Sequence, residues 1–157
     1  MALVAAATFL ETYHGIVAGA DMVAHLAHSS APVVFEDWAT DPGSAVILAE
    51  TTVGAAPIGY AVVTSPDLPV PLDTGDFELR RMYVLAPFHR AGVGAALMTA
   101  AVAAARARGA GRLLLGVHGG NDRAHRFYER QGFAKAGTRR FLVGGVRHDD
   151  LVYARTL

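Results

Sequence analysis

Two periods of apolar residues alternate along the chain and divide it into helices and strands. Helical spacing predicts helices over Ala2–His14 and over Asp21–His28, the second capped by its own first residue, and a short helical or loop segment over Pro32–Thr40. Two apolar runs, AVILAE at 45–50 and IGYAVVT at 58–64, predict strands joined by a turn. The first 64 residues therefore read as helices followed by a strand pair.

The second half alternates strand and helix. The proline-rich stretch at 65–75 must be a loop. The elements expected after it are a strand over Phe77–Leu85, a helix over Gly92–Arg108, a continuously apolar strand over Arg112–His118, a helix from the cap Asn121 to Gly132, and a closing hairpin of Phe141–Val143 and Asp150–Ala154. Strand–helix–strand order implies parallel pairing through a right-handed crossover.

Composition narrows the class of protein. A chain of 157 residues is expected to form one domain over residues 1–157, large enough to bury a core. The absence of cysteine excludes disulfides and a cysteine nucleophile, and we expect no metal site. The sequence has neither a membrane-length apolar run nor a basic leader, so we expect a cytoplasmic protein without membrane or nucleic-acid partners.

The net charge of zero conceals a strong asymmetry. Residues 1–79 carry ten acidic residues and no lysine or arginine, whereas residues 80–157 carry fourteen basic and four acidic residues. This division indicates either that one half faces a cationic ligand and the other an anionic one, or that the two halves complement each other within the fold.

The stretch FHRAGVGAALM at 88–98 places two glycines where a helix must begin. Because the first-turn N–H groups have no partners within the helix, glycines there allow an anion to approach them. A phosphate cradle and an unliganded tight turn both fit. A Walker A loop is excluded because Ala95 and Ala96 follow Gly94, and a dinucleotide fingerprint because Leu97 takes the place of its third glycine.

With the segment ELRRMYVLAPFHRAGVGAALM and the later NDRAHRFYERQGF, the chain resembles the GNAT superfamily of N-acetyltransferases. The resemblance implies an α/β (α+β) fold with a mixed sheet, a splayed parallel strand pair and helices on both faces. It also implies transfer of an acetyl group from acetyl-CoA to a primary amine. The ending FLVGGVRHDDLVYARTL is similar to bacterial spermidine/spermine-type members, so a small cationic amine or polyamine is the expected acceptor. A protein or peptide acetyltransferase and a non-catalytic coenzyme A-binding module remain alternatives.

The resemblance also implies a coenzyme site. The pyrophosphate loop would run from Arg90 to Ala95, and His89 stands where the family has glutamine or arginine. The backbone of one strand would pair with the pantetheine arm. The implied cofactor residues are Met82, Tyr83, Val84, His89, Arg90, Ala91, Gly92, Val93, Gly94, Ala95 and Asn121, the last of which is also a helix cap.

Catalytic roles follow from the same resemblance. Tyr128 matches the tyrosine that protonates the departing thiolate, although a core position fits its spacing too. Glu78 takes the position of a general base, with an exposed strand-end carboxylate as the alternative and His118 as a second candidate base. Candidates for the acceptor pocket are Glu36, Asp37, Trp38, Asp149 and Asp150.

One departure from the family concerns the start of the sheet. Family members begin with a strand, whereas this chain begins with a predicted helix, MALVAAATFLETYHG. Either the start is short or the first strand of the family is missing by nature; we expect the edge of 45–50 to be open, which favours a homodimer or a compensating terminal segment.

Overall fold

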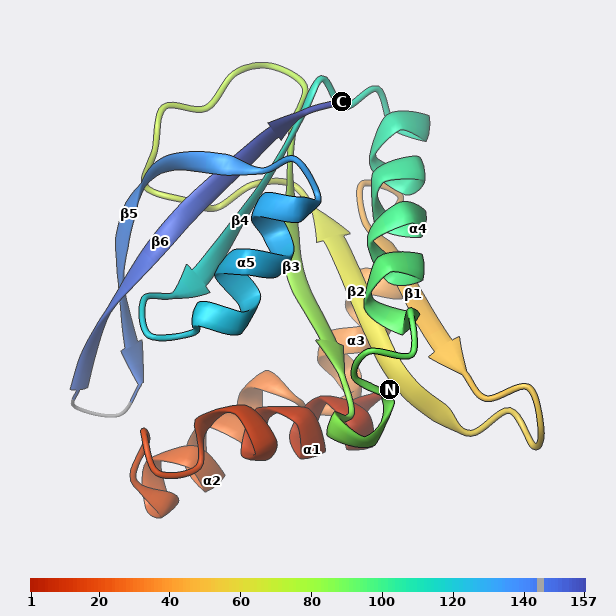
Figure 1. Ribbon diagram of the computed structural model, residues 1–157, viewed down its shortest axis with the longest axis vertical. Helices are drawn as coiled ribbons and strands as arrows, with labels where there is room; N and C mark the ends of the chain where they lie inside the picture. Colours follow the sequence, from red (N-terminus) through yellow and green to blue (C-terminus); the bar gives the residue numbers. More distant parts are fainter. Residues whose placement is uncertain (144–145) are drawn as a thin grey trace.

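Three helices, α1 (Ala2–Tyr13), α2 (Gly19–Ser29) and α3 (Pro32–Thr40), occupy the first 40 residues of the computed structural model (Figure 1). The structure describes residues 1–143 and 146–157, with the side chains of 141–148 left out of the description. No helix in these parts is long and apolar enough to cross a membrane. The expected helices are present, with one correction. The N-cap of α2 is Ala18, and Asp21 lies in the first turn, where its charge still complements the helix dipole.

The remaining chain forms a six-stranded mixed sheet of order β1-β2-β3-β4-β6-β5. The strands are β1 (Ala45–Glu50), β2 (Pro57–Thr64), β3 (Asp76–Val84), β4 (Arg112–His118), β5 (Ala134–Val143) and β6 (Val146–Thr156). Only β3 and β4 pair in parallel; the other neighbours are antiparallel. The outer edge of β1 pairs with no other described strand, as expected for a sheet without the family's first strand.

The parallel pair separates after a short contact. Strands β3 and β4 share three register pairs, the last of which joins Glu78 to Leu114. Beyond it, β3 continues to Val84 and β4 to His118 without further pairing. A bulge against β2 leaves Arg80 without a register partner, because Val62 faces Arg81 and Val63 faces Leu79. A bulge bends its strand and increases the local twist, which explains why β3 turns away here.

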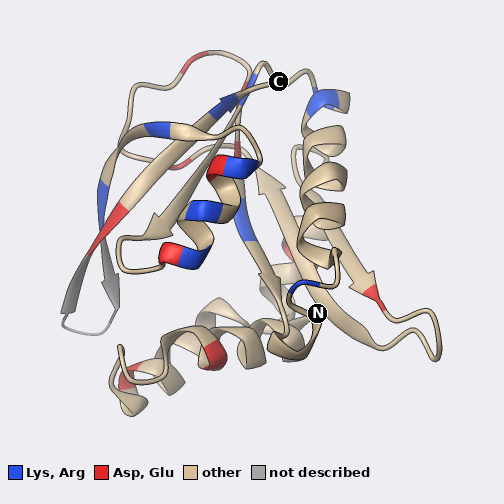
Figure 2. Ribbon diagram, in the orientation of Figure 1, with Lys and Arg blue, Asp and Glu red and all other residues tan. Residues whose placement is uncertain are grey.

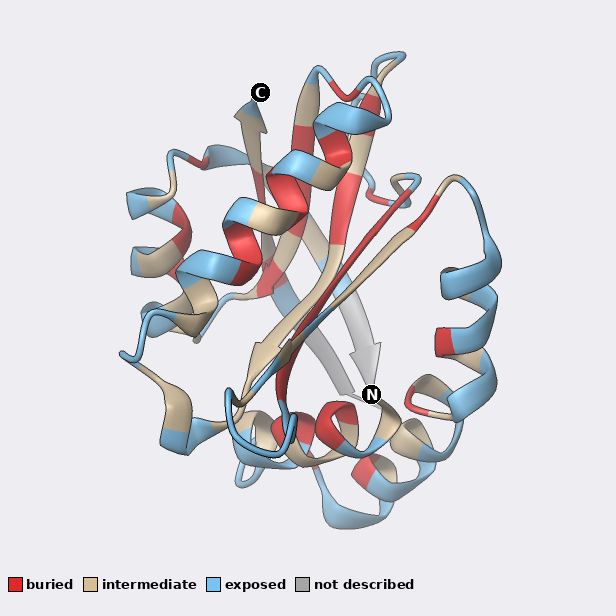
Figure 3. Cartoon of the chain, turned by 90° about the vertical axis from the view of Figure 1, so that its right-hand side faces the viewer, coloured by how far each residue is buried: buried red, intermediate tan, exposed pale blue. Residues whose placement is uncertain are grey.

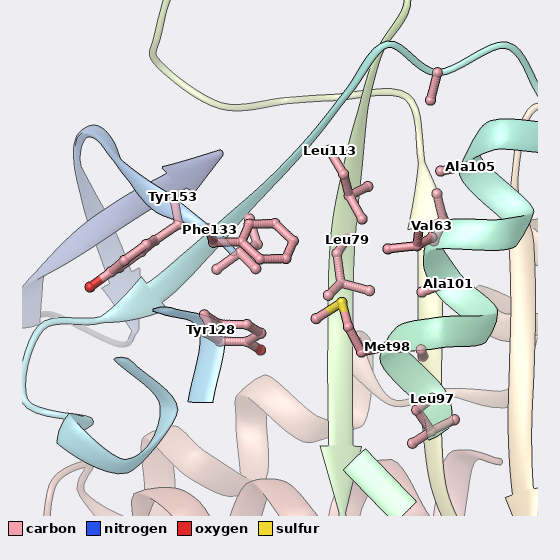
Figure 4. Packing of buried hydrophobic residues seen from close by; sticks show 14 of the residues in the cluster. Val63, Leu79, Leu97, Met98, Ala101, Ala105, Leu113, Tyr128, Phe133 and Tyr153 are labelled. Atoms are coloured by element: carbon pink, nitrogen blue, oxygen red, sulfur yellow. The ribbon is translucent and has the colours of Figure 1, made fainter. Parts of the chain in front are cut away.

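Helices cover both faces of the sheet. Helix α4 (Val93–Ala107) follows the short helix η1 (Ala86–Phe88) and packs with α5 (Asp122–Arg130) on one face, where Leu97, Met98 and Tyr128 join the largest core cluster (Figure 4). Helices α1 and α3 cover the other face over Tyr60 and Val62. Buried and exposed segments alternate along these helices (Figure 3).

The C-terminal hairpin is longer than predicted. Strands β5 and β6 extend far beyond 141–143 and 150–154. Because β5 is an edge strand, it needs no continuous apolar face, and its sequence AKAGTRR gives little strand signal. A register shift between Lys135 and Gly137 further breaks the alternation.

Candidate active site

A cleft of about 920 Å³ occupies the space between the separated strands. It is lined by β3 from Leu79 to Val84, by β4 from Gly116 to His118, by the loop before α4, by α5 and by the end of α1. The opening therefore runs through the sheet from the α4–α5 side to the α1 side. The described residues contain no group of three or more potential metal ligands.

The loop before α4 has the backbone of an anion cradle. Arg90 and Gly92 both adopt left-handed conformations, with φ of 68° and 83°. Gly92 is the N-cap of α4 and has no side-chain capping bond, so the amides of Val93, Gly94 and Ala95 have no acceptor within the helix. A Cβ at Gly92 would meet nothing within 4 Å, so the loop faces open space. Arg90, Gly92, Gly94 and Ala95 line the cleft, whereas Ala91 and Val93 belong to the same turn without lining it.

His89 connects three elements around this loop. Its Nε2 donates to the carbonyl oxygen of Val84 at 2.8 Å, and its Nδ1 accepts from Nη1 of Arg123 on α5 at 2.6 Å. Asn121 caps α5 by accepting from the amide of Ala124 at 3.1 Å, and it also lines the cleft. The N-terminus of α5 therefore lies beside the N-terminus of α4.

Basic side chains line the cleft, and Arg90, Arg123 and Arg126 come from the loop before α4 and from α5, whereas Arg81 is directed to Trp38 on the other face. Figure 2 shows lysine and arginine positions on α5, on the loop before α4 and on β3. Those lining the cleft are Arg80, Arg81, Arg90, Arg123, Arg126 and Arg130, and no aspartate or glutamate lines it among the described residues. The field favours an anion.

Strand β3 presents an unpaired edge to the cleft beyond Glu78. Met82, Tyr83 and Val84 all line the opening, and this stretch of β3 has no partner on the β4 side. Their side chains are also used in packing, with the Tyr83 ring stacked 5.9 Å from Tyr60. The carbonyl of Val84 already accepts a hydrogen bond from His89. A ligand that pairs with β3 like a strand would therefore use the backbone groups that precede Val84.

Tyr128 reaches the same cleft from α5. Its ring contacts Phe127 and Phe133 edge-on, at 5.3 Å and 5.9 Å between centroids, and is directed toward β3 (Figure 4). Burial raises the pKa of its hydroxyl above the usual value, and neighbouring Tyr83 adds to the rise. The hydroxyl therefore stays protonated at neutral pH and is available as a donor.

Glu78 is buried and lies just where the strands separate. Its Oε2 accepts from the amide of Asp67 at 2.9 Å and pairs with Nη2 of Arg80 at 3.1 Å. Burial raises the pKa of this carboxyl, while the Asp67 amide and Arg80 oppose the rise. Glu78 does not line the cleft itself. A proton from a ligand would have to reach it through water, because the guanidinium of Arg80 cannot accept one.

The predicted acceptor residues are not gathered around the cleft. Glu36 and Asp37 are exposed on α3, and Trp38 packs under the guanidinium of Arg81, 4.9 Å from its ring centroid. Asp149 is exposed on β6, whereas Asp150 is buried and accepts from Nε of Arg139 at 3.1 Å. None of these acids lines the cleft.

Instead, α1 supplies side chains to the end of the cleft that lies opposite the loop before α4. Tyr13 and Thr12 line the cleft opposite His118, whose ring meets that of Tyr13 edge-on at 6.1 Å. The hydroxyls of Tyr13 and Tyr83 lie close enough to interact, and burial raises the pKa of each. Sequence reasoning missed Tyr13, because its position at the end of a helix gives no signal of a partner 70 residues away.

These features fit coenzyme A. An open glycine cradle at a helix N-terminus suits a pyrophosphate, the basic side chains around it suit its charge, and a free strand edge suits an amide-bearing arm. The residues that would hold it are those of the Arg90–Ala95 loop, the β3 edge and Asn121.

Two comparisons with known proteins, one with a family model and one with curated relatives, both indicate N-acetyltransferases. The model of the acetyltransferase (GNAT) family matches residues 10–133. An uncharacterised N-acetyltransferase of Mycobacterium tuberculosis (strain ATCC 25618 / H37Rv) is 34% identical over 157 residues, covering all of this chain and 96% of the relative.

Two solved structures are similar in fold. Nourseothricin acetyltransferase aligns with a TM-score of 0.64 and 28% identity, over 74% of this chain and 66% of that one. PaiA N-acetyltransferase from Thermoplasma acidophilum, solved with coenzyme A, aligns with a TM-score of 0.75 over 99% of this chain and 90% of that one. At 16% identity, the second likeness concerns the fold alone.

Proposed function

The chain belongs to the GNAT family of acetyl-CoA-dependent N-acetyltransferases, and we propose that its acceptor is a small cationic amine that enters from the α1 side. The observation that carries this proposal is the cleft through the sheet, with a phosphate cradle at one end and Thr12, Tyr13 and His118 at the other. Such a passage lets a donor and an acceptor meet from opposite faces. The proposal treats residues 1–157 as one domain built on the single described sheet.

Tyr128 is the proposed general acid. Acetyl-CoA supplies an activated acetyl thioester when it is bound. The Tyr128 hydroxyl would donate its proton to the leaving sulfur, and its raised pKa keeps it protonated for this task. Its place in the cleft supports the role.

Glu78 is the proposed base. An alkyl ammonium must lose a proton before its nitrogen can attack, and Glu78 is a buried carboxylate at the point where β3 leaves β4. Because burial raises its pKa, it is a stronger base than an exposed carboxylate. Since it does not line the cleft, the proton reaches it through water. His118, which does line the cleft, is the second candidate.

The charge of the acceptor is argued from the α1 side. A smaller hollow of about 180 Å³ there is lined by Glu11, Tyr13, His118 and Arg123 among others. Glu11 is exposed, and its Oε2 accepts from the amide of Ala86 at 3.0 Å. A carboxylate beside aromatic rings suits an ammonium group. By contrast, many acids of the first half are used within the fold: Arg80 pairs with Asp67 and Glu78, and Arg112 with Asp73 and Asp76. The support for a polyamine of the spermidine/spermine type therefore rests on Glu11 more than on the total charge.

The test is acetylation of a panel of amines, followed by release of the coenzyme thiol. The panel contains spermidine, a monoamine of similar length, a free amino acid and a peptide with a free N-terminus, each at two ionic strengths. We expect the highest kcat/KM with spermidine and a weaker preference at high salt, because surface charge is screened within about 10 Å at 0.1 M. Equal or better use of the amino acid would rule out the cationic-amine proposal. A peptide as best substrate would favour a protein acetyltransferase.

A further inference from the structure

We propose that Arg123, positioned by His89, supplies the cation that binds the pyrophosphate of coenzyme A. His89 precedes the glycine loop, where a side chain that binds phosphate would be useful. Its ring, however, has no nitrogen left to bind a phosphate oxygen. Both of its nitrogens are engaged, one by the Val84 carbonyl and the other by Arg123.

The two contacts of His89 are chemically complementary. A carbonyl oxygen only accepts, so Nε2 must carry the ring proton. Nδ1 is then a lone pair, and arginine, which only donates, is its natural partner. At 2.8 Å and 2.6 Å both bonds are short. The neutral imidazole therefore holds the guanidinium of Arg123 beside the end of β3.

The contact with His89 leaves the positive charge of Arg123 available to bind an anion. In the described part of the chain Arg123 forms no ion pair, whereas Arg80, Arg112 and Arg139 each pair with a buried carboxylate. A neutral acceptor orients a guanidinium without cancelling its charge. Arginine has five donors, so a contact through one Nη leaves others to bind phosphate oxygens.

Arg123 also lies at the right end of the cleft. It lines the cleft together with His89, Gly92, Gly94 and Asn121, so the α5 N-terminus brings it next to the cradle at the start of α4. Arg90 is the other candidate from the loop itself. Its side chain is exposed and has no hydrogen bond within the described residues, so binding would have to order it. A guanidinium that is already held loses less entropy on binding.

The test measures binding of coenzyme A and of its truncated forms by calorimetry. Arg123→Ala should weaken binding of coenzyme A about 10- to 100-fold, the range for loss of a charge-assisted hydrogen bond. Dephospho-coenzyme A, which keeps the pyrophosphate, should show the same loss. For Arg123→Ala, the kcat/KM for S-acetylpantetheine, which lacks the pyrophosphate, should fall much less than the kcat/KM for acetyl-CoA.

His89→Ala tests the positioning role by a double-mutant cycle. It should weaken coenzyme A binding in the parent but add little once Arg123 is alanine. Arg106→Ala removes the same charge from an exposed position in the last turn of α4 and should change binding less than twofold. Arg123→Gln, which removes the charge but keeps a donor, serves if the alanine variant lowers the melting temperature of the free protein.

Four results would overturn the proposal. They are parental affinity in Arg123→Ala, a loss that disappears with dephospho-coenzyme A and so assigns Arg123 to another phosphate, additive losses in the cycle, and a loss of kcat/KM in Arg123→Ala that is as large for S-acetylpantetheine as for acetyl-CoA. The last would mean that Arg123 acts on a part of the site other than the pyrophosphate.

Discussion

Replacing Gly94 with alanine separates the stability of the fold from coenzyme binding, because the two should change in opposite directions. A Cβ at Gly94 would lie 3.6 Å from the Phe127 ring, an ordinary contact, and Gly94 does not have a positive φ. Alanine is favoured over glycine in a helix by up to about 1 kcal/mol. In a chain of this size that corresponds to a rise in melting temperature of about 2–4 °C.

The added methyl group should nevertheless obstruct the cradle. Loss of one charge-assisted hydrogen bond weakens binding about 10- to 100-fold. At 100 times its Kd, acetyl-CoA stabilises the parent by about 2.7 kcal/mol, or about 5–11 °C. If the Kd rises 100-fold, the same concentration gives only about 0.4 kcal/mol, or about 1–2 °C.

The assay is thermal unfolding with and without acetyl-CoA. Gly111→Ala is the matched control, because a Cβ there meets nothing within 4 Å and Gly111 lies outside the cleft lining. The control should keep the full ligand-induced shift. A Gly94→Ala protein that shows the parental shift would mean that the pyrophosphate does not lie on these amides.

Three further predictions concern catalysis and stability. Tyr128→Phe should lower turnover about 10²–10⁴-fold while leaving coenzyme affinity and melting temperature nearly unchanged, because the ring contacts remain; parental turnover would make Tyr128 a packing residue only. Glu78→Gln should lower kcat/KM most at pH values above the raised pKa of Glu78 and below the pKa of the amine, where the base is ionised and the amine still carries its proton. It should cost little stability at pH 7, because burial disfavours the ionised form of Glu78; an unchanged pH profile would assign the base elsewhere. Asp76→Asn should destabilise the fold by about 1–3 kcal/mol at pH 7 in urea unfolding. Arg112 lowers the pKa of Asp76, so the stabilisation is present above the unfolded-state pKa and is lost as pH falls through the folded-state value; a pH-independent difference would contradict this account.

The backbone of the proposed coenzyme end was largely predictable from sequence because its parts are local. The cradle is a turn, a left-handed glycine and a helix N-terminus within a few consecutive residues, and its chemistry is mostly that of the backbone. Asn121 was likewise predictable as the N-cap of the helix that follows it. Such features follow from residue type and spacing. The His89–Arg123 contact could not be predicted, because it joins residues 34 positions apart whose proximity depends on the packing of α5.

The strands, too, were predictable only where the signal lies within one segment. The apolar run of β4 marked a strand covered on both faces, whereas the polar edge strand β5 gave almost no signal and its length was underestimated. The separation of β3 from β4 depends on register, and register is a property of two strands together.

The proposed acceptor end differs because no single segment builds it. Tyr13 comes from α1, Tyr83 from β3 and His118 from β4, so their meeting depends on how α1 lies on the sheet. Charge counted along the chain is equally misleading there. The division at residue 79 suggested two faces of opposite sign, but Arg80 and Arg112 from the second half pair with Asp67, Glu78, Asp73 and Asp76 from the first. An acid that is neutralised within the fold cannot also attract a substrate over a distance. Under the proposed function, the charge preference would be set by carboxylates near the α1 opening that form no ion pair among the described residues; Glu11, whose carboxylate accepts from the Ala86 amide, is the one that lines the hollow beside Tyr13.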